Sequence, residues 1–501
     1  MRKLFIAIIF LMNVICVVNV SSQSKRNNSS NNDSVVAVVG DIKITINEFV
    51  NGYEYGPAFY KRIRNSKKVF LDNLVREKLL ALDGISRRLD TTQNVQEYYN
   101  AFCDDLATEE LFKDEIQSKI TITQEEIDTT AKQKLIDVEL QWLYTVRKDG
   151  IIKVNDSLKN GVDFQKLFER ELNDTVSIDD RSLKSSRYQL EMKNPELGKI
   201  IDKLEIGTVS APVKTNDGWY IVRLKNFSYN IIPSETEQNK ILSEARTAVM
   251  KMKIDRLSDK YVNELLTAQN PVIKRKPFQI LRSYLAAYEL TKEKYLEWEL
   301  DGKLEEAKKE FDTNDYSQII LAELKDFKIT LNDFVVWYRT RGQYAKFDQR
   351  SFAQFSRSLE EMIWRMIRDK LLTSTAKSKG YYDRKNVVEQ SKWWLDKILY
   401  ASVKNEMINL IVVENKEVNS GSTNNQSQNE FIEAELTKKL FRKINELKKK
   451  YPVKINEKLL NGIKVSGEED VQSVDFYTVK RGGLIPRTPY PTIDNYWARW
   501  Q

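Results

Sequence analysis

The stretch LEIGTVSAPVKTNDGWYIVRL, residues 204–224, is the part of this sequence that most strongly decides the fold. Gly207 and Gly218 suit tight turns that need a positive φ angle. Pro212 fits a strand edge or a turn, where its missing N–H costs little. The apolar side chains that would fill a small core are Val209, Val213, Trp219 and Ile221. The stretch therefore predicts two turns followed by a strand over 218–224.

The residues before this stretch predict a second strand. VELQWLYTV (138–146) alternates apolar and polar residues, as a strand does. Residues 156–172 predict a helix between the two strands. Further along the chain the sequence is rich in Glu, Lys, Arg and Leu and poor in Gly and Pro, which predicts long helices over 234–268, 289–311, 385–412 and 430–450.

An internal repeat flanks the predicted sheet. Residues 41–49 (DIKITINEF) recur as 326–334 (DFKITLNDF), and 74–80 (LVREKLL) recur as 366–372 (MIRDKLL). Each copy predicts a strand, a turn and a long amphipathic helix. Thr45 and Thr330 are predicted N-caps, with Glu48 and Asp333 three residues later completing a capping box. Two copies indicate a duplicated module rather than a solenoid.

The N-terminus has the layout of a secretory signal. Arg2 and Lys3 precede an apolar run from Leu4 to Val20, and small residues follow at a cleavage position near Ser22. We expect export and cleavage, with an uncleaved membrane anchor as the alternative. If the signal is removed, Cys103 is the one cysteine left, so no internal disulfide is possible.

Composition excludes several classes of chemistry. The 501 residues contain no histidine and two cysteines, so Ser-His and Cys-His nucleophilic centres are excluded and a zinc site is disfavoured. Neither a P-loop nor a dinucleotide-binding glycine motif is present. The net charge of +8 is modest for this length, and no nucleic-acid motif accompanies the basic run 438–450. We therefore expect no cofactor, no metal and no nucleic-acid partner.

The middle segment resembles the parvulin family of peptidyl-prolyl isomerases. The resemblance rests on GVDFQKL (161–167) and on the quoted stretch 204–224, which follow the family's G-x-D-F-x-x-L and L-x-x-G-x-V-S-x-P-V motifs. The repeated hairpin and helix are similar to the N-terminal region of SurA-type periplasmic chaperones. The resemblance implies an α+β protein, with mostly helical, duplicated chaperone modules around one small parvulin-like antiparallel-sheet domain.

Domain limits follow from these assignments. In chain order we expect a signal peptide (1–22), a linker (23–34), an N-terminal helical module (35–130), a parvulin-like domain (131–230), a connecting long helix (231–277), a second helical module repeating the first (278–413), a linker (414–430), and a C-terminal helix with an aromatic and proline-rich tail (431–501).

The active groove of parvulins commonly has histidines on its first and last strands, and this chain departs from that pattern. The matching position on the last strand is Tyr220, and on the first strand it is Gln141 or Trp142, since a register slip of one residue reverses which side chain faces inward. With Phe164, these residues are the candidates for a peptide-binding groove. No catalytic residue is assigned.

Three functions are compatible with these features. The first is a periplasmic folding factor that binds unfolded envelope proteins and whose isomerase domain has little or no activity. The second is an active parvulin-type isomerase. The third is a structural subunit of an outer-membrane secretion or assembly complex, docked through the aromatic tail that contains Tyr490, Tyr496, Trp497 and Trp500.

Overall fold

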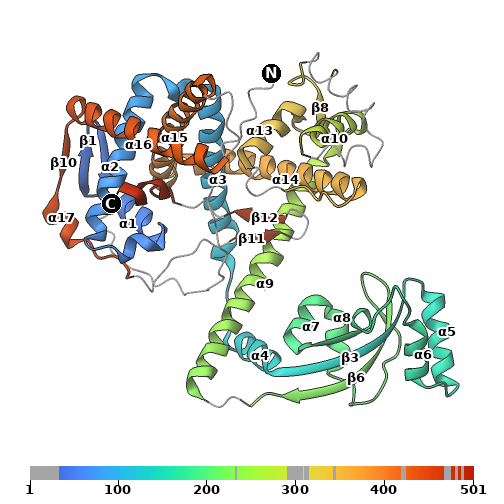
Figure 1. Cartoon of the computed structure of the whole chain (residues 1–501). Coiled ribbons are helices and arrows are strands. Elements are labelled where there is room, and N and C mark those ends of the chain that lie inside the picture. The colour runs from blue at the N-terminus through green and yellow to red at the C-terminus, as the bar shows by residue number, and fades with distance from the viewer. Residues whose placement is uncertain are drawn as a thin grey trace. The chain divides into compact units, whose positions relative to one another are not determined.

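The computed structural model describes residues 33–231, 234–289, 309, 315–341, 346–418, 425–467, 476–479, 483–486 and 490–500. The predicted signal peptide and nearly all of the linker 23–34 lie outside these residues. The chain divides into two compact units, which are shown in Figure 1. We call residues 120–254 the sheet unit, and residues 1–119 with 255–501 the helical unit. Helices predominate and the sheets are small and antiparallel, so the predicted α+β class is confirmed.

The sheet unit is built on one four-stranded antiparallel sheet with the order β4-β3-β6-β5. Its two long central strands are β3 (Ile136–Thr145) and β6 (Trp219–Tyr229), and the edge strands are β4 (Ser182–Ser186) and β5 (Val213–Lys214). The helices of this unit are α4 (Gln124–Leu135), α5 (Lys148–Lys159), α6 (Phe164–Glu171), α7 (Arg187–Lys193), α8 (Pro195–Ile201) and the first part of α9 (Glu235–Gln269).

Apolar residues cover both faces of this sheet. Leu140, Val222 and Leu224 pack on one face with Leu190 and Leu197 from α7 and α8. On the opposite face, helices α5 and α6 cover the sheet with the buried residues Ile151, Phe164 and Phe168, which pack against Leu143 and Ile221. Successive side chains of β3 point to opposite faces of the sheet, so this strand, predicted from 138–146, contributes to two separate cores.

The first module of the helical unit begins with the hairpin β1 (Val35–Val39) and β2 (Ile42–Thr45). The helices α1 (Ile46–Glu54) and α2 (Ser66–Ser86) follow, and α3 (Gln93–Glu115) comes after them. Strand β10 (Val453–Ile455) completes this sheet beside β1. The same core contains residues from α15 (Lys385–Val418), α16 (Asn425–Lys450), α17 (Glu457–Gly462) and the short helix η6 (Asn495–Trp500). In Figure 1, α15 and α16 lie beside α2 and the β1 sheet.

The second module has its own sheet and core. Strands β7 (Val272–Ile273), β8 (Ile320–Glu323) and β9 (Lys328–Thr330) form the sheet. The described helices that pack with it are α10 (Arg275–Glu289), α13 (Leu331–Arg341) and α14 (Phe352–Ser378). Helix α3 contacts α13, α14 and α15 and so joins the two modules. Phe102 of α3 stacks on Trp394 of α15, with ring centroids 3.8 Å apart.

The remaining short elements connect these parts. They are the 3-10 helices η1 (Ala58–Arg62), η2 (Leu89–Thr91), η3 (Gln117–Lys119), η4 (Ile178–Asp180) and η5 (Tyr381–Asp383), and the hairpin of β11 (Phe476–Val479) with β12 (Gly483–Pro486). No helix within the described ranges combines the length and the apolar character needed to cross a membrane.

The structure departs from the expected domain limits in several places. The sheet unit spans 120–254 instead of the expected 131–230. Helix α15, which was predicted to belong to the second module, packs against α2 and α3. The predicted linker 414–430 is helical wherever it is described, because α15 extends to Val418 and α16 begins at Asn425. Its Ser/Asn/Gln composition indicated a linker, but most of these residues are compatible with a helix end.

The internal repeat is preserved in three dimensions. Both hairpins have a register shift at the same place, between Val35 and Ala37 in β1 and between Ile320 and Ala322 in β8. Each helix that follows has a lysine that pairs with the acidic residue of the N-cap motif. Lys78 lies 2.5 Å from Glu48, and Lys370 lies 3.3 Å from Asp333.

The predicted capping box forms fully only in the second copy. Asp333 accepts hydrogen bonds from the backbone and hydroxyl of Thr330, and Thr330 accepts one from the Asp333 backbone. In the first copy, Thr45 accepts from the Glu48 backbone, but the prediction that Glu48 completes the box is wrong. Its side chain is buried and turned towards Lys78, which supplies a full charge instead of a backbone N–H.

These two lysines give a matched test of burial. The side chain of Lys78 is 3% exposed and bridges Glu48 and Asp396, whereas that of Lys370 is 41% exposed. Lys78→Ala leaves two carboxylates without their buried cation, so we expect a loss of about 3–5 kcal/mol in the free energy of unfolding. Lys370→Ala should cost about 1 kcal/mol or less. Urea unfolding of both variants measures this, and equal losses would contradict the assignment.

Candidate peptide-binding site

The register of the two central strands decides which candidate residues lie together. Tyr144 pairs with Tyr220, Trp142 with Val222, and Gln141 with Arg223. Directly paired residues of antiparallel strands point to the same face, and neighbours along a strand point to opposite faces. Trp142 and Tyr144 therefore share a face with Tyr220, and Gln141 lies on the other face.

Gln141 and Phe164 belong to the opposite side of the sheet. Phe164 is 4% exposed and fills the core beneath α5 and α6. Gln141 is 9% exposed, and among the described residues its Oε1 atom has no hydrogen-bond partner. The structure thus brings Trp142 and Tyr220 together and places Gln141 and Phe164 away from them.

Three aromatic side chains, Trp142, Tyr144 and Tyr220, form what we call the aromatic face. The ring of Tyr220 lies 5.0 Å from that of Tyr144 and 6.1 Å from that of Trp142, measured between centroids. All three side chains are partly buried. Rings at these separations form a cohesive apolar surface with a polar edge.

Asp217 anchors both tyrosines from the turn before β6. The Tyr220 hydroxyl donates to Asp217 Oδ2 at 2.7 Å, and the Tyr144 hydroxyl donates to the Asp217 carbonyl at 2.8 Å. The turn itself is closed by the Thr215 backbone N–H, which donates to the Gly218 carbonyl at 2.9 Å. The ring positions are therefore fixed by hydrogen bonds as well as by packing.

A paired arginine borders the aromatic face. The guanidinium of Arg181 lies 5.4 Å from the centre of the Tyr144 ring, a cation–π contact. Its Nε atom donates to Glu171 at 2.9 Å, and Glu171 also accepts from the Tyr144 backbone N–H at 3.3 Å. This pair adds a polar rim to one side of the rings.

The pKa values of Tyr220 and Asp217 are shifted in opposite directions, each away from neutral pH. Burial and the neighbouring Asp217 carboxylate raise the pKa of Tyr220. Burial would raise the pKa of Asp217, but hydrogen bonds from Thr215 and Tyr220 outweigh it and lower the pKa. Tyr220 is therefore a neutral donor and Asp217 an ionised acceptor around pH 7, which suits binding rather than general acid–base chemistry.

Within the described segments, acidic and cysteine side chains do not gather in groups of three that would hold a metal ion.

Comparisons with known proteins match a range of residues that includes most of the sheet unit. Residues 91–233 match the family model of the PPIC-type PPIASE domain. This match places a domain of the PPIC (parvulin) type in the sheet unit. The foldase protein PrsA of Caldanaerobacter subterraneus is 26% identical over 291 residues, which is 51% of this chain and 92% of that relative.

Solved structures of similar proteins include PrsA from Bacillus anthracis, at 15% identity and a TM-score of 0.24, covering 39% of this chain and 96% of that one. The SurA-like chaperones PEB4 and Cj1289 of Campylobacter jejuni are also similar. That match has 16% identity and a TM-score of 0.21, and it covers 47% of this chain and 97% of the matched chain.

Sequence reasoning missed Tyr144, Asp217 and Arg181. Tyr144 was accessible in principle, because it lies two residues after Trp142 on a strand and so shares its face. Asp217 lies in the quoted stretch directly before Gly218 and was read only as part of a turn. Arg181 has no local signal, since its position over Tyr144 depends on the pairing of β4 with β3.

Gly218 gives a test of this packing. A Cβ atom at this position would lie 2.5 Å from Cε2 of Tyr144 and 2.9 Å from the Thr145 carbonyl. Gly218→Ala should therefore displace the Tyr144 ring and destabilise the domain by about 1–3 kcal/mol. Near-UV circular dichroism and urea unfolding measure the two effects. Gly462→Ala, where nothing lies within 4 Å, is the control and should change neither signal.

Proposed function

We propose that the protein is an exported folding factor that binds unfolded envelope proteins, and that its parvulin-type domain binds extended peptide with little or no isomerase activity. The observation that carries this proposal is the aromatic face, where Trp142, Tyr144 and Tyr220 stand on a parvulin-type sheet in a chain without histidine. The relative named as a foldase supports the folding role.

Peptide binding suits the chemistry of the aromatic face. Partly buried Trp and Tyr side chains are rigid and amphipathic, so they gain apolar contact at a low cost in side-chain entropy. The two tyrosine oxygens keep lone pairs that can accept from a peptide N–H while their protons are held by Asp217. A proline ring with its apolar neighbours fits such a surface without any charged partner.

Weak catalysis follows from the same residues. Rotation about a peptide bond crosses roughly 18–20 kcal/mol, and an isomerase lowers this barrier by binding the twisted amide better than the planar forms. That preference needs preorganised polar groups around the amide. Here the hydroxyl protons of Tyr144 and Tyr220 already point to Asp217, so they are not aimed at a substrate.

An active isomerase is the alternative, since the reaction needs neither a nucleophile nor a metal. It would require the aromatic face alone to favour the twisted amide. The histidine-free face makes this the weaker proposal, and the two differ in a measurable rate of proline isomerisation.

Membership of an outer-membrane complex through the C-terminal tail receives less support. Trp497, which the sequence suggested as a docking residue, is fully buried in the first module, and Tyr496 packs against the same core. These side chains are thus engaged within the chain. Trp500 has no described side-chain environment. Export to the periplasm rests on the N-terminal signal pattern, and membrane association remains its alternative.

The helical unit offers apolar surface for clients in addition to the aromatic face. Leu410 and Val413 of α15 are each 57% exposed, and Phe441 of α16 is 58% exposed. These helices pack against each other. Exposed apolar side chains on neighbouring helices are typical of surfaces that bind other chains.

The proposal predicts that Tyr220 contributes to peptide affinity. Tyr220→Ala should raise the Kd for a fluorescent, proline-containing unfolded peptide about tenfold, because an anchoring aromatic side chain is lost. Tyr229→Ala is the matched control, since Tyr229 lies on the same strand, is 69% exposed, and is about 30 Å from Tyr220 by strand length.

Fluorescence anisotropy measures both affinities, and the same variants are then compared for suppressing the aggregation of an unfolded protein. Unchanged affinity in Tyr220→Ala, or an equal loss in Tyr229→Ala, would refute the role of the aromatic face.

A further inference from the structure

The two copies of the repeat differ at one informative position. When the two copies are aligned so that Phe49 matches Phe334, Gly52 matches Trp337. The following helices match in the same way, so that Glu77 of α2 corresponds to Asp369 of α14. The second module therefore has a tryptophan where the first has a glycine.

In the second module the tryptophan and the carboxylate bind each other. Trp337 is 7% exposed, and its Nε1 atom donates to Asp369 Oδ2 at 2.9 Å. The second module thus obtains this buried tryptophan from its own helix α13.

In the first module the indole comes from the far end of the chain. Trp497 is fully buried, and its Nε1 atom donates to Glu77 Oε1 at 2.9 Å. The segment 490–500, which we call the C-terminal strap, thereby supplies to Glu77 what Trp337 supplies to Asp369. The same bond recurs at equivalent carboxylates, with a donor from a different part of the sequence.

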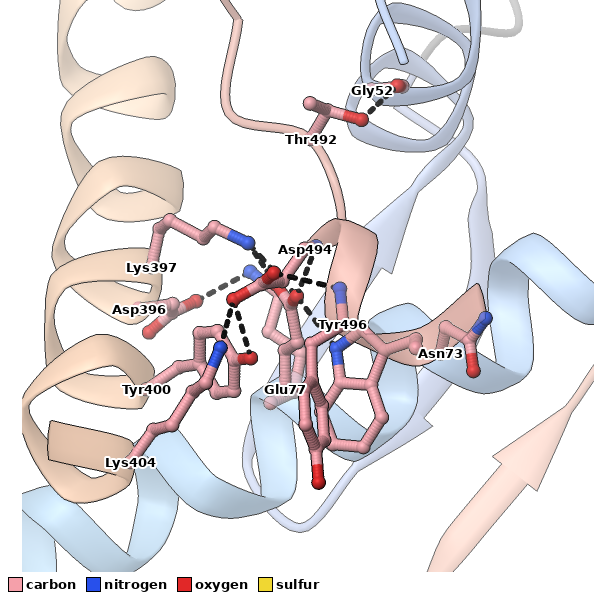
Figure 2. Close-up of polar contacts among 12 residues, drawn as sticks. Gly52, Asn73, Glu77, Asp396, Lys397, Tyr400, Lys404, Thr492, Asp494 and Tyr496 are labelled. Carbon is pink, nitrogen blue, oxygen red and sulfur yellow. Dashed lines mark hydrogen bonds and ion pairs between the residues drawn. The ribbon is translucent and has the colours of Figure 1, made fainter. Parts of the chain in front are cut away.

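Gly52 leaves room for the C-terminal strap. A Cβ atom on Gly52 would lie 3.2 Å from the Pro491 carbonyl and 3.3 Å from Cζ of Phe70. The hydroxyl of Thr492 donates to the Gly52 carbonyl at 2.8 Å, a contact shown in Figure 2. A larger residue at position 52 would therefore compete with the strap for the same space.

Asp494 adds a charged contact between the strap and the module. It accepts from Lys404 at 2.6 Å and from the Tyr400 hydroxyl at 2.9 Å, both on α15 (Figure 2). Its backbone N–H donates to Glu77 at 2.7 Å. Burial would raise the pKa of Asp494, but Lys404 and Lys397 outweigh it and lower the pKa to about 2. The carboxylate is therefore ionised throughout the neutral range.

These contacts have the form of peptide recognition. One fully buried tryptophan and Ile493, which is 2% exposed, are the apolar anchors. The ion pair of Asp494 with Lys404, whose side chains are 20% and 16% exposed, fixes the register. Between this strap and α17, the described strands β11 and β12 pair with each other. The strap thus joins the module by its own contacts rather than as the continuation of a packed element.

We propose that the first module contains a peptide-recognition site, formed by α1, α2 and α15. It binds a segment in which an irregular stretch ends at Asp and a 3-10 turn then places Trp three residues later. Its resident occupant is the chain's own strap, and the site binds the same segment when it is supplied as a separate peptide. This site is separate from the aromatic face and stands whether or not the proposed function of that face is correct.

A cleavable form of the full chain tests the proposal while the protein is folded. A specific protease site is inserted between Pro486 and Tyr490, the chain is cut after folding, and a fluorescent peptide of residues 490–501 is added. We expect saturable binding as the labelled peptide replaces the cut strap. The uncut chain should bind it at least about tenfold more weakly, because the tethered strap holds a high effective concentration.

Peptide variants distinguish specific recognition from nonspecific binding. Peptides carrying Trp497→Ala or Asp494→Asn should each lose about tenfold or more in affinity, whereas Asn495→Ala, at an exposed position, should bind normally. Equal binding by all four peptides, equal binding to cut and uncut protein, or collapse of the protein on cutting would overturn the proposal.

The variant Gly52→Trp gives an independent test of the site within the protein itself. A tryptophan at position 52 should take the place that Trp337 has in the second module and so exclude the strap. The cut variant should then bind the labelled peptide at least about tenfold more weakly. Gly462→Trp, at an exposed position with nothing within 4 Å, is the control and should leave peptide binding unchanged. Full peptide affinity in Gly52→Trp would contradict the proposed location.

Discussion

The buried carboxylate of Glu77 is the constraint on which the first module depends. It is 3% exposed and accepts from Lys397 of α15, from the backbone of Asp494 and from the indole of Trp497. A buried charge without partners is costly, so the donors must be held in place. Because they come from α15 and from the C-terminal strap, satisfying one side chain of α2 requires segments hundreds of residues apart to pack together.

This requirement explains why the chain order and the modules do not coincide. The repeat predicted from residues 41–49 and 326–334 is present, with the same hairpin irregularity in both copies. What the repeat cannot reveal is which helix covers each copy. Helix α15 follows the second copy in sequence but packs against α2, since the partner of Glu77 is Lys397. Local patterns predict elements, whereas long-range polar pairs select their neighbours.

The candidate site shows the same division between local and long-range information. The strands of the parvulin-type domain, their turns and the place of Tyr220 were predictable from residues 204–224 and 138–146. The choice between Gln141 and Trp142 was not, because a slip of one residue exchanges the two faces of a strand. The observed pairing of Tyr144 with Tyr220 selects Trp142 and adds Tyr144, and it moves Gln141 to the face covered by α5 and α6. Phe164 was placed in the groove through a resemblance, and its own burial puts it in the core.

In this chain without histidine, the face that carries Trp142, Tyr144 and Tyr220 holds both tyrosine hydroxyls on Asp217. The most direct test is NMR exchange spectroscopy of a proline-containing peptide mixed with the purified protein, because it reports binding and isomerisation in one sample. We predict that the peptide resonances broaden on binding, while cis–trans exchange keeps its uncatalysed time of roughly tens to hundreds of seconds. Exchange accelerated in proportion to protein concentration, and lost in Tyr220→Ala, would contradict the account.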